Sequence, residues 1–334
     1  MLSVKATSLP FFFLLYYPML LTKPHKEYAE LVDILLTRKM VVEDISYAKR
    51  KLSQVGYYRL SGFWFTSRRT AIVTENGIRQ SQFIDEFLPN TSFNEVYKLY
   101  LFDKKLRLLL LDIIERLEVN IRSVMAHELG RIDPLAYKSE KFIKKDHSKI
   151  RKNYDDVWLP KLQGEIKRNK AEFIIYHREN DKEIPFWVIV EIWDFGTLSK
   201  YYSFLKGNNQ KKISKKFGID HVTFEKWLRE INILRNLCAH HSRVWNKDFN
   251  AITLPNTRVE TNERTSQRVF SRILILWYLI QQTDSKNYKW LEKLKDLIDT
   301  DFPNVPNAKL EFMGLGNYKT LPIELMKQNY NEST

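Results

Sequence analysis

The sequence predicts an all-α protein, with one large helical domain and an N-terminal helical subregion. Apolar side chains recur at steps of three and four along most of the 334 residues, which is the spacing of one helix face. One such pattern runs without a break from residue 92 to residue 129. The chain has only ten glycines and no G-x-G-x-x-G or G-x-x-x-x-G-K-[ST] motif, which argues against a nucleotide-binding α/β fold. We expect an apolar N-terminal segment at 1–22, a helical domain at 23–300 and a C-terminal tail at 301–334.

The helices are expected in a clear order along the chain. The strongest pattern begins at a Ser92–Glu95 capping box and stops at Gly130. Residues 56–65 are aromatic and fit either a short helix or an extended connection, and residues 74–77 fit a turn. Residues 138–182 are polar and are the expected place for an insertion. A buried helix is expected from Pro185 to an end at Gly196. The other predicted helices are 27–36, 43–55, 198–205, 221–245, 268–281 and 288–297.

Charge and cysteine content restrict the partners and the compartment. The chain has 54 Lys and Arg against 40 Asp and Glu, a net charge of +14, which predicts a polyanionic partner. Its one cysteine excludes a disulfide framework and a cysteine-rich zinc site and favours a reducing, cytoplasmic location. The seven histidines do not have the spacing of metal ligands, so we expect neither a metal nor another cofactor.

Residues 9–21, LPFFFLLYYPMLL, are strongly apolar. A bilayer-spanning helix needs about 20 residues, and this stretch is shorter and contains two prolines. Three interpretations remain open: a weak signal or anchor, a strand or helix within the core, or translated upstream sequence with initiation at Met19. We assign the segment no function.

The segment 234–246, LRNLCAHHSRVWN, carries the most informative side chains. On a helix over 221–245, a core stripe would contain Trp227 and Cys238, so the cysteine is interpreted as a small hydrophobic residue. Asn236, His240 and Arg243 would project together from the opposite face, about 180° away. Their apolar edge would be Ile233 and Val244.

These residue types suit RNA cleavage without a metal. A histidine titrates near neutral pH, so it can take the proton of a ribose 2′-OH or protonate the leaving oxygen. Arginine presents a planar fork to phosphate and stabilises charge that develops in the transition state. Asparagine can orient either group. The ordinary alternative is a solvated basic helix face, because R-x-x-x-x-H spacing arises often by chance.

Four segments, in order, resemble the bacterial abortive-infection (Abi-like) family of the HEPN superfamily. They are VGYYRLSGFW at 55–64, ERLEVNIR at 115–122, PFWVIVEIWDFGTLS at 185–199 and the Arg-Asn-containing R-x(4)-H segment at 234–246. The similar region covers about residues 23–279.

The resemblance implies a HEPN-type helical bundle and a metal-independent endoribonuclease that leaves a 2′,3′-cyclic phosphate. It implies Arg235 and His240 as the catalytic pair, with Asn236 as their helper. It also implies two such helices in one composite site, hence a homodimer. The implied biology is phage defence by growth arrest, or a toxin held in check by an RNA or protein antitoxin.

Several other residues have open roles. Glu191 lies in an apolar run, so we expect it to be buried and paired with Arg235, for catalysis or for structure alone. His241 points towards the core stripe of the predicted helix and is interpreted as packed rather than catalytic. Arg122 and His127 repeat the R-x-x-x-x-H spacing, but Glu118 lies four residues before Arg122, where an ordinary ion pair forms. We favour a structural or RNA-facing role over a second half-site.

An acid-free run from 195 to 219 contains six lysines. It is either a solvated loop or a phosphate-binding surface that leads RNA towards His240. The candidate RNA-binding residues are Lys211, Lys212, Lys215 and Lys216. Three functions therefore compete: an endoribonuclease, a non-catalytic RNA-binding or scaffolding protein, and a membrane-associated effector that uses residues 9–21.

Overall fold

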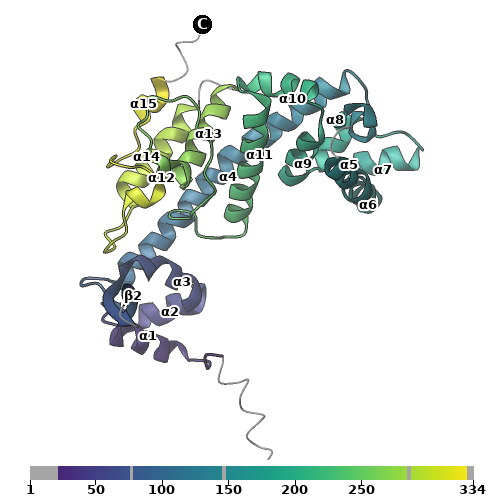
Figure 1. Ribbon diagram of the computed structural model, residues 1–334. Coiled ribbons are helices and arrows are strands. Elements are labelled where there is room, and N and C mark those ends of the chain that lie inside the picture. The colour runs from purple at the N-terminus through teal and green to yellow at the C-terminus, as the bar shows by residue number, and fades with distance from the viewer. Residues whose placement is uncertain (1–21, 76–77, 145–147, 284–286, 329–334) are drawn as a thin grey trace, which may run out of the picture. The chain divides into compact units, whose positions relative to one another are not determined.

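The computed structural model describes residues 22–75, 78–144, 148–283 and 287–328. These residues are predominantly helical, which confirms the predicted fold class (Figure 1). Strands are confined to one hairpin within the described residues. The apolar segment 9–21, including Met19, lies outside them. Within the described chain, no helix has both the length and the apolar character needed to cross a bilayer.

Internal contacts divide the chain into two compact units, residues 1–97 and 98–334. The described part of the first unit contains α1 (Tyr28–Thr37), α2 (Ile45–Val55) and α3 (Tyr57–Trp64). Asp44 caps α2 by accepting a hydrogen bond from the Tyr47 N–H. Gly56 joins α2 to α3 at φ +89°, a conformation that favours glycine, and the aromatic stretch at 56–65 is thus helical.

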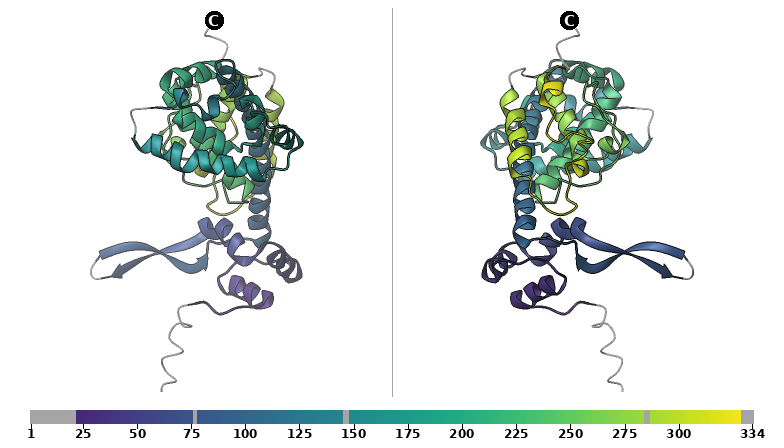
Figure 2. Two further views of the ribbon diagram at one scale, coloured as in Figure 1. Left: turned by 90° about the vertical axis from the view of Figure 1, so that its right-hand side faces the viewer. Right: turned by 90° about the vertical axis from the view of Figure 1, so that its left-hand side faces the viewer.

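The first unit also contains an antiparallel hairpin of β1 (Arg68–Glu75) and β2 (Ile78–Phe87). Figure 2 shows it as a long ribbon that extends away from the helices of this unit. A two-stranded ribbon is marginal alone, so its base is held by side chains. Phe65 packs on Phe83 with ring centroids 4.7 Å apart, and Arg68 donates to the Ile84 carbonyl oxygen.

The longest helix, α4 (Phe93–Gly130), contains 38 residues and crosses the boundary between the units in the sequence. Ser92 accepts a hydrogen bond from the Asn94 N–H at its start, and the helix ends at the glycine that the sequence predicted. Its buried stripe includes Leu106, Leu110 and Leu117. The helix spans about 57 Å at the usual rise of 1.5 Å per residue.

The second unit consists of α4 from residue 98 onward and the helices that follow it. They are α5 (Ser148–Asn153), α6 (Leu159–Arg168), α7 (Glu172–Glu179), α8 (Phe186–Ile189), α9 (Phe195–Phe204), α10 (Gly207–Ser214), α11 (His221–Ala239), α12 (Glu263–Ser266), α13 (Val269–Gln281), α14 (Tyr288–Asp301) and α15 (Ile323–Gln328). A single π-helical turn, Tyr154–Trp158, joins α5 to α6.

An aromatic cluster and a buried ion pair hold the helices of this unit together. Trp158 stacks on Tyr201, which also contacts Trp193, so the 138–182 region and α9 share an aromatic core. On the other side of α9, helix α11 packs against both α9 and α13. Glu230 of α11 and Arg272 of α13 form a fully buried ion pair. The segment after residue 301 is packed as well, because the Trp277 indole donates to the Met326 carbonyl oxygen at 3.0 Å.

The structure corrects the helix end that was predicted at Gly196. Gly196 does not end a helix: it lies in the first turn of α9, whose N-cap is Asp194. The helix that begins after Pro185 is short, and a 3₁₀ turn, Val190–Ile192, follows it. A Cβ at Gly196 would lie 3.5 Å from the Asn232 side chain, so α9 and α11 approach closely here.

Candidate functional site

Helix α11 presents the R-x-x-x-x-H segment. Asp220 caps its start by accepting hydrogen bonds from the N–H groups of Val222 and Thr223. The predicted core stripe is confirmed, since Trp227 and Cys238 are both buried. Burial raises the pKa of the Cys238 thiol to about 12, so this side chain is a protonated core group rather than a nucleophile.

The helix ends at Ala239, six residues before the predicted end at Trp245. His240 is the C-cap, and His241 adopts a left-handed conformation with φ +58°. The His241 N–H donates to the Cys238 carbonyl, and the Ser242 N–H donates to the Leu237 carbonyl. This pair of hydrogen bonds is a Schellman motif, with histidine at the position where glycine is usual.

The early helix end changes three predictions. Arg243 does not continue the row of Asn236 and His240, because it lies in the loop beyond the helix. Val244 is buried and therefore does not edge an exposed cluster. His241 is exposed rather than packed towards the core. All three corrections have one cause: the left-handed residue turns the chain out of the helical path.

Asp103 of α4 holds the loop beyond the helix, a role that no sequence pattern indicates. One of its carboxylate oxygens accepts hydrogen bonds from the N–H groups of Val244 (2.9 Å) and Trp245 (2.8 Å). The other pairs with Arg107 at 3.2 Å. Burial lowers the pKa of the nearby Arg243 guanidinium, and the charge of Asp103 opposes that effect.

Arg235 and Asn236 lie side by side on the last turns of α11. Nη1 of Arg235 donates to Oδ1 of Asn236 at 3.3 Å, and both side chains are partly exposed. Arg235 also interacts electrostatically with Glu118 of α4 and with Asp194, the N-cap of α9. Burial raises the pKa of the Glu118 carboxyl, while Arg122 and Arg235 oppose this effect. Two carboxylates from other elements thus act on Arg235 through their charge.

The expected partnership of Glu191 with Arg235 is wrong. The Glu191 side chain is 55% exposed, and its carboxylate lies 3.8 Å from Arg122 instead. Glu191 sits on a 3₁₀ turn, which directs it outward although its neighbours are apolar. Glu118, rather than Glu191, interacts electrostatically with Arg235.

The second R-x-x-x-x-H pair, on α4, has a structural arginine. Arg122 donates to the Glu118 carboxylate and to the Trp193 carbonyl oxygen, both at 2.9 Å. It therefore joins α4 to the chain just before α9. His127 is exposed and lines a surface cavity with Trp187, whose ring lies against Gly130.

Burial alone would raise the pKa of the Asp194 carboxyl, but other groups hold it below its usual range. Its side chain accepts a 2.7 Å hydrogen bond from the Thr197 N–H, and the charges of Lys161 and Arg235 add to the effect. Glu118 of the segment 115–122 and Asp194 of the segment 185–199 thus both interact electrostatically with Arg235. Three of the four family-like segments converge around one arginine.

The candidate lysines are exposed, on α10 and the short turn Lys215–Phe217 after it. Lys216 pairs with Glu128 at 3.5 Å. These residues precede the N-terminal end of α11, whereas His240 follows its C-terminal end. The 19 residues between these ends correspond to about 28 Å. The structure does not bring these lysines to the histidine.

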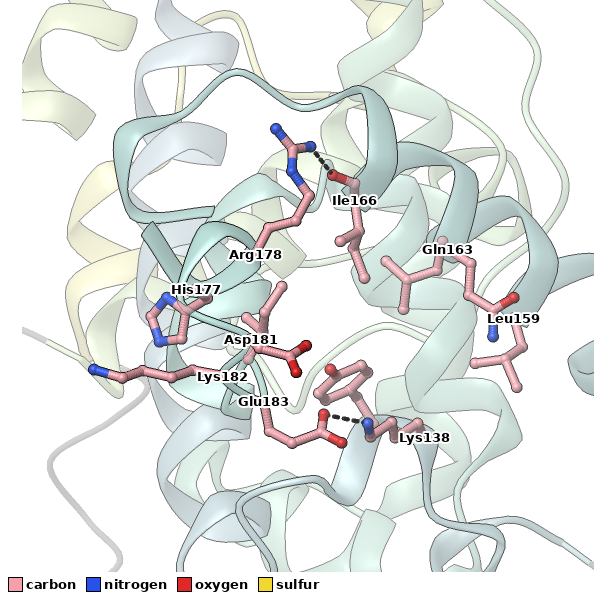
Figure 3. Close-up of a pocket in the computed structure, with 12 residues that line it drawn as sticks. Lys138, Leu159, Gln163, Ile166, His177, Arg178, Asp181, Lys182 and Glu183 are labelled. Atoms are coloured by element: carbon pink, nitrogen blue, oxygen red, sulfur yellow. Dashed lines mark hydrogen bonds and ion pairs between the residues drawn. The ribbon is translucent and has the colours of Figure 1, made fainter. Parts of the chain in front are cut away.

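A cavity of about 290 Å³ lies within the 137–184 region, and sequence patterns did not indicate it (Figure 3). Its floor contains apolar side chains of α6, and its rim is charged. The rim groups engage one another: Lys138 pairs with Glu183, and Arg178 donates to the Lys167 carbonyl oxygen at 2.8 Å. These pairings leave the rim with few groups aimed at a ligand.

Comparisons with known proteins add one match. A family model described as Abi-like protein matches residues 50–246, more than half of the chain. No curated protein and no solved structure matches. Within the described residues, no group of three or more His, Cys, Asp or Glu side chains is placed to hold a metal ion.

Proposed function

This chain belongs to the Abi-like protein family, and from that premise we propose that it is an abortive-infection endoribonuclease that works without a metal. The family suggests a role in defence by growth arrest. We extend this to RNA cleavage by a HEPN-type site, with Arg235, Asn236 and His240 as its residues. A toxin–antitoxin arrangement, with an RNA or protein antitoxin, is part of the same proposal.

The observation that supports this most is the arrangement at the end of α11. Arg235 and Asn236 are hydrogen-bonded to each other, and exposed His240, four positions after Asn236, is the C-cap of the helix. In the proposed reaction, His240 takes the proton of a ribose 2′-OH. The 2′-oxygen attacks the adjacent phosphorus, the bond to the 5′-oxygen breaks, and the leaving oxygen is protonated. The products are a 2′,3′-cyclic phosphate and a 5′-hydroxyl.

Each residue has a separate task in this scheme. The Arg235 guanidinium binds the scissile phosphate and stabilises the charge that develops on its oxygens. Asn236 shares a helix face with His240, one turn away, and also contacts Arg235. It can therefore hold the phosphate and the His240 imidazole in position relative to each other. In this scheme the charges of Glu118 and Asp194 help to orient the arginine.

The geometry of α11 also favours a homodimer. His240 lies five positions after Arg235, which places their side chains about 140° apart around the helix. One helix therefore presents its arginine and histidine in different directions. A second copy of α11 facing the first would bring an arginine and a histidine from opposite subunits to one phosphate. It would also supply the second histidine for proton transfer and cover Ile233, which is 37% exposed.

The decisive experiment compares purified wild type, His240→Ala and His127→Ala on mixed RNA in the presence of EDTA. We expect wild type and His127→Ala to cleave RNA and leave 2′,3′-cyclic phosphate ends, and His240→Ala to be inactive. His127 is an exposed histidine on another helix, so it controls for loss of an imidazole. Equal RNA decay in all three proteins, or none in any, would overturn the catalytic assignment.

The alternative is a non-catalytic RNA-binding or scaffolding protein. The exposed lysines Lys211, Lys212 and Lys215, remote from His240, favour it as the second candidate. It predicts salt-sensitive RNA binding without cleavage by wild type. The same RNA mixture, analysed for both binding and decay, distinguishes the two functions.

A further inference from the structure

A groove runs between α9 and α11 in the second unit and was not part of any expected site. It encloses about 410 Å³, and Ile150 of α5 contributes to its lining. Its walls carry hydroxyl, amide and cationic groups. They include Ser199, Lys200 and Ser203 from α9 and Glu225, Lys226, Arg229 and Asn232 from α11.

The groove has an excess of positive charge. Lys200, Lys226 and Arg229 are all exposed, and no carboxylate among the described residues lies within ion-pair distance of them. The one acid, Glu225, is engaged elsewhere: Gln210 donates to it at 2.8 Å, and Lys144 lies 3.4 Å away. The groove thus has three exposed cations and one acid that is already paired. Its net positive charge favours the binding of an anion.

The groove also points towards the candidate site. At 100° per residue, Arg229 and Asn232 lie on the same stripe of α11 as Asn236, within about 60° of one another. His240 follows one turn later on that stripe. The distance along the helix from Arg229 to His240 is about 16 Å, against about 28 Å from the beginning of α11. A chain that lies in the groove therefore leads directly to Asn236 and His240.

We propose that this groove binds the phosphodiester backbone of single-stranded RNA and guides it to the end of α11. The inference rests on the proposed nuclease function and names its substrate as unpaired RNA. Basic grooves that follow a backbone are the usual means of holding single strands. Lys226 and Arg229 contact phosphates, and the Asn232 amide and the serine hydroxyls complete the hydrogen bonds.

The test measures the binding of a labelled oligouridylate, which is unstructured, in a His240→Ala background that cannot cleave. The groove variant is Lys226→Ala/Arg229→Ala. The matched control, Lys293→Ala/Lys319→Ala, removes two exposed charges on and after α14, which lies across α11 from α9 (Figure 1). A third variant, Lys211→Ala/Lys212→Ala, tests the competing surface on α10. Arg229→Lys keeps the charge and checks that the fold tolerates substitution.

We expect the groove variant to bind about ten-fold more weakly, while the control and Arg229→Lys stay near the parent affinity. The slope of log affinity against log salt should fall by roughly 0.7 for each phosphate contact removed, or roughly 1.4 in all. In the cleaving protein, the same variant should raise KM with little change in kcat.

Three results would overturn the proposal. Unchanged affinity and salt slope in the groove variant would refute it while leaving wild-type cleavage, and hence the nuclease function, intact. Weakening by Lys211→Ala/Lys212→Ala alone would move the RNA path to α10. Groove-dependent binding with no cleavage by wild type would support the groove and refute the nuclease. No binding and no cleavage would refute both.

Discussion

The carboxylate of Asp103 accepts a 2.9 Å hydrogen bond from the backbone N–H of Val244, although 141 residues separate them in the sequence. The same oxygen accepts from Trp245, so a single buried side chain of α4 satisfies two consecutive amides of the loop after α11. The loop begins at His241, next to the proposed general base. Asp103 therefore supports the position of His240 without being near enough to the surface to touch RNA.

Asp103→Ala should be strongly destabilising. It removes the acceptor of two buried N–H groups and leaves Arg107, which is 5% exposed, without its partner. Loss of one member of a buried ion pair typically costs about 3–5 kcal/mol. Thermal unfolding should shift by roughly 2 to 4 °C per kcal/mol.

Asp112→Ala on the same helix is the matched control. Its carboxylate pairs with Arg116 at 2.8 Å but is 58% exposed, so its loss should cost less than about 1 kcal/mol. Equal losses of stability in the two variants would show that the Asp103 contacts do not hold the loop.

The main helices could be predicted because their signals are local. The 38-residue α4 has an apolar stripe, a capping serine and a terminal glycine, and each of these follows from a few neighbouring residues. The core stripe of α11 was predicted for the same reason. The hairpin had a local signal too, because the dipeptide Asn76-Gly77 in the sequence is typical of two-residue hairpin turns. The residues on either side were too polar for the strands to be predicted.

The site was harder to predict because its geometry depends on distant contacts. No glycine or proline marks the end of α11 in the sequence. The helical spacing of apolar residues therefore continues past His240 and His241, although the helix itself ends at Ala239. Glu191 was the predicted partner of Arg235, and only the placement of the 3₁₀ turn shows that it points outward, near Arg122 instead. Sequence patterns name the residues of such a site but do not fix which of them meet.

His241→Gly should stabilise the protein by about 1 kcal/mol. His241 has φ +58°, and an L side chain in the left-handed region pays a steric cost that glycine avoids. The denaturant midpoint should therefore increase without a change in its slope. His241→Ala keeps the steric cost and is the control. A destabilised glycine variant would mean that the imidazole makes a contact worth more than the strain.

Arg122→Ala and His127→Ala should affect the protein in different ways. Arg122 makes two hydrogen bonds of 2.9 Å and its loss leaves the partly buried Glu118 with less compensation, so we expect a cost of about 2–3 kcal/mol. His127 is exposed, and its loss should change neither stability nor RNA cleavage. Calorimetry and a cleavage assay on both variants check this. Inactive but fully stable His127→Ala would identify a second catalytic half-site on α4.

The stability of wild type should fall more steeply in acid than that of Asp194→Asn. The pKa of Asp194 is held below its ordinary value in the folded protein, because the Thr197 hydrogen bonds and nearby cations outweigh the effect of burial. The ionised carboxylate therefore adds stability above the unfolded pKa of about 4, and this contribution disappears as the pH falls through the lower folded pKa. Asparagine can still accept the Thr197 N–H as an N-cap but does not titrate.

The urea midpoints of both proteins, measured from neutral pH down to pH 3, give the difference in stability between wild type and Asp194→Asn. Taking this difference cancels the titration of every other acid. The difference should be constant near neutrality and shrink below about pH 4. A difference that grows in acid would mean that burial dominates and that Asp194 is a poor anchor for Arg235.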